Sequence, residues 1–175
     1  MALTIDQIRN VNSDEALLDL LLTELRCLFP PERREDPIVF LSFLQAAPQG
    51  LRAMATTYDL DVSMALDDLA WHFVNHHSSQ DFAEETILGL RELGAAEAAE
   101  IFAAAFAIIQ PFWVELENVP SEEAHAWLDS TGIQGRIDPL TQRLWDLLKQ
   151  QPSNSLMDYW GAYARKNPQH CLAAS

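Results

Sequence analysis

The stretch that decides the fold of this chain is Gly94–Pro111, which reads GAAEAAEIFAAAFAIIQP. Most of its residues are strong helix formers, and Glu97 and Glu100 suit the positive end of a helix dipole. No charged or strongly polar side chain occurs within Ile101–Ile109. A helix that is apolar on every side is buried in protein or in a membrane, and this run is far shorter than the ~20 apolar residues that span a bilayer. We therefore predict a core helix at about residues 95–110.

Helical signals continue on both sides of this core helix, and no segment alternates as a strand would. The predicted helices are Thr4–Asn10, Ser13–Phe29, Ile38–Ala47, Pro48–Tyr58, Asp61 to the turn at Asn75–Ser79, Gln80–Leu93, Phe112–Asn118, Pro120–Ser130, Asp138 to Pro152, and Ser155–Asn167. Thr4 and Gln7 are predicted to form a capping box, and Ser13 and Asp36 are predicted N-caps. Asp61 is predicted as an N-cap that separates two helices, and Thr131–Gly135 as a loop. The chain is therefore predicted to be all-α, a single domain over residues 1–175 in which about 8–10 helices pack around the Ala/Phe-rich core helix.

Apolar spacing also predicts which helix faces are buried. The helix after Ser13 carries a broad apolar stripe of Leu17, Leu18, Leu21, Leu22, Leu25, Leu28 and Phe29. The helix that ends before Gly94 is predicted to bury Phe82, Thr86, Leu90 and Leu93, and to expose Asp81, Glu84, Glu85 and Glu92. Gly94 itself is the expected left-handed C-terminal cap.

The composition bounds the class of protein. With 175 residues and 49% hydrophobic residues, the chain can bury a core of its own. Cys27 and Cys171 lie far apart and neither has metal-ligand spacing around it. We predict no cofactor. The N-terminus lacks a basic region followed by an apolar one, so the expectation is a cytoplasmic protein of bacterial type.

Acidic residues are concentrated in the middle of the chain. The net charge is −15, and the segment Asp59–Asp129 holds 15 acidic residues and one basic residue, Arg91. The remaining residues hold 11 acidic and 10 basic residues, so nearly the whole imbalance belongs to that segment. Nucleic acid and anionic membranes both require positive charge on the protein. We therefore expect a basic protein partner, with no direct binding to nucleic acid or membrane.

Rows of carboxylates on successive helical turns provide the candidate partner-binding site. One helical turn advances about 5.4 Å, and duplex DNA carries one charge per about 3.4 Å on each strand, so such rows can approximate a phosphate track. The candidate partner-binding residues are Asp67, Asp68, Asp81, Glu84, Glu85, Glu115, Glu117, Glu122 and Glu123. The alternative is a solvated acidic face that keeps the protein soluble.

A metal site is the second candidate. Asp68, His72 and His76 follow one another at one-turn spacing, as the ligands of a divalent ion could. Glu122 and His125 have the Glu-x-x-His spacing of helical di-iron proteins, but those need a second such pair. Because histidines on a wet surface more often cap turns or pair with carboxylates, no metal site is predicted. A metal-dependent enzyme that uses His72 and His76 remains an alternative function.

Nucleophilic catalysis has little support. Ser78, Ser79 and Ser121 stand where helix caps belong, and no glycine-rich phosphate loop occurs. No catalytic residue is predicted, and the chain is expected not to be an enzyme. Trp71 and Trp113 lie beside apolar stripes, with a partly exposed groove as the alternative to core packing. A structural or oligomerising module, for example a homodimer, is a third alternative function.

The order of these features resembles a known family. Phe82 lies in a helix that ends in Leu93-Gly94-Ala95, an Ala-rich helix follows, and then come a Trp145–Leu148 helix and a final Tyr163–Pro168 segment. Over about residues 55–170 the chain is similar to the small all-helical acidic domain family that includes a DNA-mimic protein, and residues 1–54 form preceding helices. The resemblance implies an all-α fold and suggests DNA mimicry. The turn Asn75–Ser79 departs from the Asn-Asn-Gly-Gly-like turn usual in that family.

Overall fold

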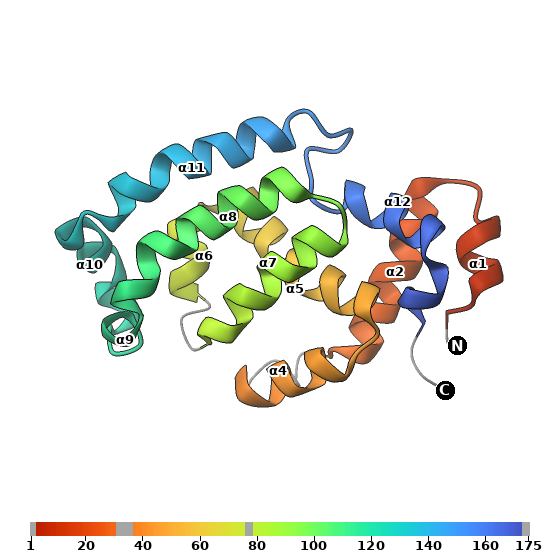
Figure 1. The fold of residues 1–175 in the computed structure, drawn as a ribbon, viewed down its shortest axis with the longest axis horizontal. Coiled ribbons are helices and arrows are strands. Elements are labelled where there is room, and N and C mark those ends of the chain that lie inside the picture. Colours follow the sequence, from red (N-terminus) through yellow and green to blue (C-terminus); the bar gives the residue numbers. More distant parts are fainter. Residues whose placement is uncertain (1–2, 31–36, 76–78, 173–175) are drawn as a thin grey trace.

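The fold is all-α, as predicted. The computed structural model describes residues 3–30, 37–75 and 79–172. These residues form eleven α-helices and three 3-10 helices, and none of them lies in a strand (Figure 1). The first and last described helices, α1 (Ile5–Asn10) and η3 (Pro168–Cys171), contact each other at one end of the molecule, whereas α9 (Trp113–Leu116) and α10 (Ala124–Thr131) lie at the other end (Figure 1).

The helix bounds follow the sequence order. The α-helices are α1 (Ile5–Asn10), α2 (Asp14–Leu28), α4 (Pro37–Ala46), α5 (Gln49–Leu66), α6 (Leu69–Asn75), α7 (Gln80–Glu92), α8 (Ala96–Ile109), α9 (Trp113–Leu116), α10 (Ala124–Thr131), α11 (Ile133–Leu148) and α12 (Asp158–Lys166). The 3-10 helices are η1 (Gln110–Phe112), η2 (Ser121–Glu123) and η3 (Pro168–Cys171).

The predicted core helix is α8, and it packs against α6, α7 and α11 (Figure 1). Phe102 is fully buried, and its ring lies 5.1 Å from that of Phe73 on α6. Ala104 and Ala107 face outward, so α8 is covered on most of its circumference rather than on all of it. Short side chains at these two positions keep the uncovered strip small.

The helical run Ala96–Leu116 comprises α8, η1 and α9. By length and composition alone this run could cross a membrane, a test that the core helices of soluble proteins also pass. Its inner side chains contact other helices of the chain: the ring of Trp113 lies 5.7 Å from Phe106 and 6.4 Å from Phe73. Trp113 is therefore buried in the core and does not line a partly exposed groove, which was the alternative for this residue.

Several predicted caps are present. The side chains of Thr4, Ser13 and Ser79 each accept a hydrogen bond from the first turn of the helix that follows, and Thr4 forms the predicted capping box with Gln7. Gly94 has φ +82°, with the backbone N–H groups of residues 94 and 95 bonded back into α7. The predicted cap at Asp36 and the serine at position 78 lie outside the described residues.

One predicted boundary is wrong: Asp61 does not begin a helix. It lies inside α5, which runs without interruption from Gln49 to Leu66. Asp61 is buried there and accepts hydrogen bonds from a distant segment. The helix is interrupted instead at Asp67–Asp68, where Oδ1 of Asp68 caps α6 by accepting the N–H of Trp71 at 2.9 Å. An Asp with this local sequence is typical of an N-cap. It does not cap a helix when its side chain is buried and hydrogen-bonded to a distant segment of the chain.

The predicted loop at Thr131–Gly135 is also wrong. Gly132 alone makes the turn, with φ +66°, and α11 starts at the next residue. Pro139 therefore lies inside α11 and does not begin it. Proline removes the hydrogen bond to the carbonyl four residues earlier, which here belongs to Gly135, an exposed residue. On the inward face of α11, Leu144, Leu147 and Leu148 are all buried, and Leu140 is half-buried.

Candidate acidic interaction surface

Most carboxylates of the segment Asp59–Asp129 are exposed and unneutralised. Ten of its 15 acidic side chains lie on the surface: Asp67, Asp81, Glu84, Glu97, Glu100, Glu115, Glu117, Glu122, Glu123 and Asp129. None of the ten forms an ion pair with a basic side chain of the described residues. The one basic residue of the segment, Arg91, is itself exposed. The charge imbalance read from the sequence is therefore located on the surface.

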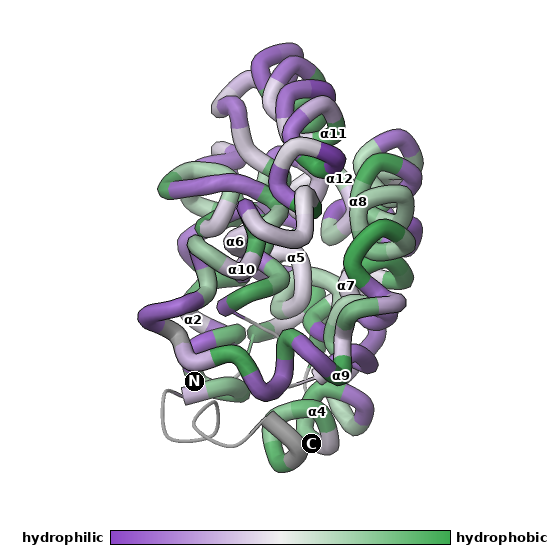
Figure 2. Tube along the Cα trace, turned by 90° about the vertical axis from the view of Figure 1, so that its left-hand side faces the viewer, coloured by the Kyte–Doolittle hydropathy of each residue, from purple (hydrophilic) through white to green (hydrophobic). Residues whose placement is uncertain are grey.

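Six of the predicted partner-binding residues lie on or beside α6, α9 and α10, and we call this part of the molecule the acidic end: Asp67, Asp68, Glu115, Glu117, Glu122 and Glu123. They come from the start of α6, from α9 and from the residues that lead into α10. In Figure 1 this is the end at which α9, α10 and the first turns of α11 meet. Figure 2 views that end face on and shows hydrophilic segments alternating with hydrophobic ones along the chain.

Hydrogen bonds join the start of α6 to the start of α11. Oδ2 of Asp68 accepts Nε2 of Gln134 at 2.9 Å, and the same amide donates to Oδ1 of Asp138 at 2.7 Å. Asp68 thus caps α6 with one oxygen and binds α11 with the other. Its main role in the described structure is to fix these two helices, and Asp67 beside it remains exposed.

Aromatic side chains hold α9 and α10 in place at the acidic end. The indole Nε1 of Trp127 donates to Oε1 of Glu115 at 2.8 Å. The ring of Trp71 on α6 meets that of His125 on α10 edge to face, with centroids 4.1 Å apart. Trp71 is half-buried and His125 exposed, so an aromatic pair lies at the surface among carboxylates. This contact was missed in the sequence, where His125 stood out only for its spacing from Glu122.

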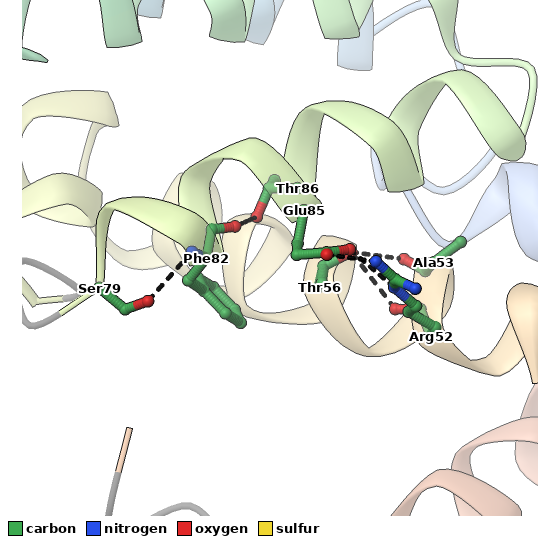
Figure 3. A network of polar contacts seen from close by, with 7 residues as sticks. All are labelled: Arg52, Ala53, Thr56, Ser79, Phe82, Glu85 and Thr86. Atoms are coloured by element: carbon green, nitrogen blue, oxygen red, sulfur yellow. Dashed lines mark hydrogen bonds and ion pairs between the residues drawn. The ribbon is translucent and has the colours of Figure 1, made fainter. Parts of the chain in front are cut away.

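Two further predicted residues, Asp81 and Glu84, lie exposed on α7, as expected. Glu85 does not, and the prediction that it is exposed is wrong. It is 7% exposed, and its carboxylate forms a two-pronged ion pair with Arg52 of α5, in which Nε donates to Oε2 at 2.7 Å (Figure 3). The bond joins the two helices that pack most extensively, so Glu85 is a structural residue.

Glu92 at the end of α7 is likewise engaged. It accepts hydrogen bonds from Gln49 and from the hydroxyl of Tyr163, and His170 lies 3.8 Å from its carboxylate. Burial, and then the hydrogen bond to Glu92, raise the pKa of the Tyr163 hydroxyl well above its usual range. This cluster ties the C-terminal η3 segment to α5 and α7, so Glu92 is only half-exposed and not fully exposed as predicted.

The metal candidates do not form a surface row. His72 is 1% exposed and not on the outer face of its helix; its Nδ1 lies 2.9 Å from Oγ of Ser63, and its ring packs against Phe102. Asp68 is committed to the contacts above, and His76 lies outside the described residues. Within the described part of the chain, no three His, Cys, Asp or Glu side chains are grouped as metal ligands.

A comparison with protein families identifies the chain's relatives. The model of the family described as DMP19-like protein matches residues 45–167, more than half of the 175 residues. The match includes every residue of the acidic end and all of α5–α12 up to Lys166. No curated protein and no solved structure matches the chain.

Proposed function

This chain belongs to the DMP19-like protein family, and from that premise we propose that it is an acidic interaction protein, a DNA mimic that occupies the DNA-binding surface of a basic partner. The partner is a DNA-binding protein, and the exposed carboxylates stand in for phosphates. We further propose that the protein acts in the cytoplasm, where such partners meet DNA.

The observation that supports this proposal is the set of ten exposed carboxylates between Asp59 and Asp129 without a described basic partner. An exposed ion pair contributes only about 0–1 kcal/mol, so no single carboxylate can carry the binding. Several of them together produce a negative potential that steers a basic protein and raises its association rate. Binding of this kind weakens as salt is added.

The acidic end is the part of this surface that we assign to the partner. Its carboxylates Glu117, Glu122 and Glu123 are exposed, and no described hydrogen bond or ion pair commits them to the fold. The Trp71–His125 pair adds a half-exposed aromatic contact beside them. Aromatic side chains are enriched among the residues that dominate binding energies at interfaces.

The test is capture of proteins from a bacterial lysate on the immobilised chain at about 0.1 M and about 1 M salt, where the Debye length falls from about 10 to about 3 Å. We expect a DNA-binding protein to be retained at low salt and lost at high salt. In a gel-shift assay, the chain in solution should then displace duplex DNA from that protein. The variant Glu117→Lys/Glu122→Lys/Glu123→Lys should lose both capture and displacement.

A matched control separates the surface from total charge. The variant Asp6→Lys/Glu97→Lys/Glu100→Lys also reverses three exposed acidic residues, but on α1 and at the start of α8, outside both the acidic end and the helices α9 and α10. Both variants raise the net charge by six units, because each reversal changes it by two. Equal loss of capture in the two variants would show that the acidic end is not the binding surface. Capture of a partner that does not release DNA would contradict mimicry.

A further inference from the structure

A second surface lies at the end of the molecule opposite the acidic end, where α2 and α12 meet (Figure 1). A groove of about 840 Å³ runs between these helices and the segment that joins α11 to α12. It adjoins a hollow of about 530 Å³ beside α5 and the end of α11, and Leu18, Ser153 and Met157 line both.

The floor of this groove is apolar. Leu18 and Leu22 belong to the predicted buried stripe of α2, but the structure leaves both half-buried and lining the groove with Met157. Ala162 of α12 also lines it and is exposed. Helices pack when the side-chain ridges of one helix fit into the grooves of another, so a groove between two helices can accept the side chains of a third helix.

Carboxylates surround that floor. The lining includes four acidic residues and one basic residue: Asp14, Glu15, Asp19, Asp158 and Arg165. Arg165 is already neutralised, since its Nη2 lies 2.8 Å from Oδ1 of Asp14. Asp158 accepts the backbone N–H of Ser153 at 2.9 Å. The side chains of Glu15 and Asp19 are exposed, and neither has a basic partner among the described residues.

This local acidity is not a consequence of the general composition. Residues outside Asp59–Asp129 are nearly balanced, with 11 acidic and 10 basic residues. The four acidic residues that line this groove, which we call the rim, are therefore a local excess of negative charge.

We propose that this groove binds a basic amphipathic helix of a partner protein, with apolar residues on the floor and Lys or Arg at the carboxylate rim. A helix that lays its apolar face into a hydrophobic groove is a recurring mode of recognition. A second copy of this chain is disfavoured as the occupant, because it carries a net charge of −15 and would bring like charge to the rim. The proposal does not depend on the DNA-mimic function, since the groove and the acidic end lie at opposite ends.

The experiment uses the full chain and a fluorescent peptide of about 18 residues, five helical turns, with Leu on one face and Lys on the other. A peptide of the same composition with its order scrambled is the control ligand. Affinity is measured by fluorescence anisotropy, and the bound residues are located from amide chemical shifts in NMR spectra. We expect chemical-shift changes confined to α2, α12 and residues 149–157. The affinity for the scrambled peptide should be at least about tenfold lower than that for the amphipathic peptide.

Three variants test the site. Glu15→Lys/Asp19→Lys removes the free rim carboxylates and should weaken binding about tenfold. Ala162→Trp fills the groove from an exposed position, and should weaken peptide binding by a similar factor without adding charge. Asp81→Lys/Glu84→Lys changes the net charge as much as the rim variant does, but on α7, and should change affinity less than about twofold. Circular dichroism and thermal unfolding confirm that each variant is folded.

Four outcomes would overturn the proposal. These are equal affinity for both peptides, equal loss in the rim variant and the α7 variant, shifts that map to the acidic end, and binding unchanged by Ala162→Trp. Self-association of the chain that Ala162→Trp abolishes would assign the groove to a homodimer instead, and sedimentation of the unliganded protein detects it. Failure of DNA displacement with intact peptide binding would refute the DNA-mimic function alone.

Discussion

Oδ1 of Asp61 accepts a hydrogen bond of 2.6 Å from the backbone N–H of Leu156, and so joins the middle of α5 to the segment before α12, 95 residues along the chain. Both carboxylate oxygens also accept the hydroxyl of Ser155 at 3.0 Å. Burial raises the pKa of Asp61 above its usual 3.8, although the hydrogen bonds from Leu156 and Ser155 oppose that shift. This contact fixes where the C-terminal helix attaches.

The raised pKa predicts how stability depends on pH. Between pH 3.8 and the pKa of Asp61 in the folded state, the folded state binds more protons than the unfolded state. The contribution of this proton to the unfolding free energy is therefore fully present below pH 3.8 and is lost as the pH rises through the folded-state pKa. Asp61→Asn keeps an oxygen for Leu156 and does not titrate. We expect the unfolding free energy of the wild type, relative to Asp61→Asn, to fall as the pH rises across that window, as measured by urea unfolding.

The alanine variant separates the hydrogen bond from the titration. Asp61→Ala leaves the buried N–H of Leu156 without its acceptor, which should cost about 1–3 kcal/mol at every pH. If Asp61→Asn and Asp61→Ala are equally unstable, the hydrogen bond to Leu156 does not explain why a carboxylate is buried here.

Replacing the adjacent residues Glu84 and Glu85 of α7 by Lys should change the unfolding free energy by very different amounts. Glu85→Lys places a cation in a buried position against Arg52 and should lower the unfolding free energy by about 2–4 kcal/mol. Glu84→Lys changes the charge equally at an exposed position and should alter stability by less than about 0.5 kcal/mol. Thermal and urea unfolding of the two variants provide the measurement. Similar stabilities would mean that the Arg52–Glu85 pair contributes little.

Two glycines in helices should respond in opposite directions to alanine. A Cβ at Gly89 on α7 would collide with Oγ1 of Thr56 and lie 3.1 Å from the carbonyl of Ala53, because α5 and α7 pack closely there. Gly89→Ala should therefore lower the unfolding free energy by about 1–3 kcal/mol. Gly135→Ala on α11 meets no atom within 4 Å and should raise it by about 0.5–1 kcal/mol. Urea unfolding compares both, and a stabilising Gly89→Ala would contradict the close packing of α5 on α7.

The buried and exposed faces of α8 give a fourth prediction. Phe102→Ala removes a fully buried ring that contacts Phe73 and His72, and should cost about 3–5 kcal/mol. Ala104→Ser lies on the outward face of the same helix and should cost less than about 0.5 kcal/mol. In calorimetry, Phe102→Ala should melt well below Ala104→Ser. Comparable melting temperatures would mean that α8 is not the centre of the core.

Local physical rules explain why much of the fold could be read from the sequence. A helix cap acts over three residues, so Thr4, Ser13 and Ser79 were identified from their neighbours alone. The long apolar run after Glu100 could be stable in water only if most of its faces were covered, and this identified α8. Counting charges along the chain likewise predicted that the segment Asp59–Asp129 would carry the acidic surface.

Long-range partners decided the rest. Asp61 and Asp68 both have the sequence features of a cap, yet only Asp68 caps a helix, because Ser155 and Leu156 occupy the carboxylate of Asp61. Glu84 and Glu85 are adjacent acidic residues, and the packing of α5 on α7 decides which of them is buried. Glu85 is buried there and pairs with Arg52, 33 residues before it.

What the sequence by itself determined was therefore the helical class, the core helix and the amount and location along the chain of the excess negative charge. Only the tertiary structure decided which carboxylates are free. It alone brings the start of α6, α9 and α10 to one end and leaves Leu18 and Leu22 in a groove at the other. The physical reason is that capping and helix periodicity act within a few residues, whereas burial and ion pairing depend on which helices pack together.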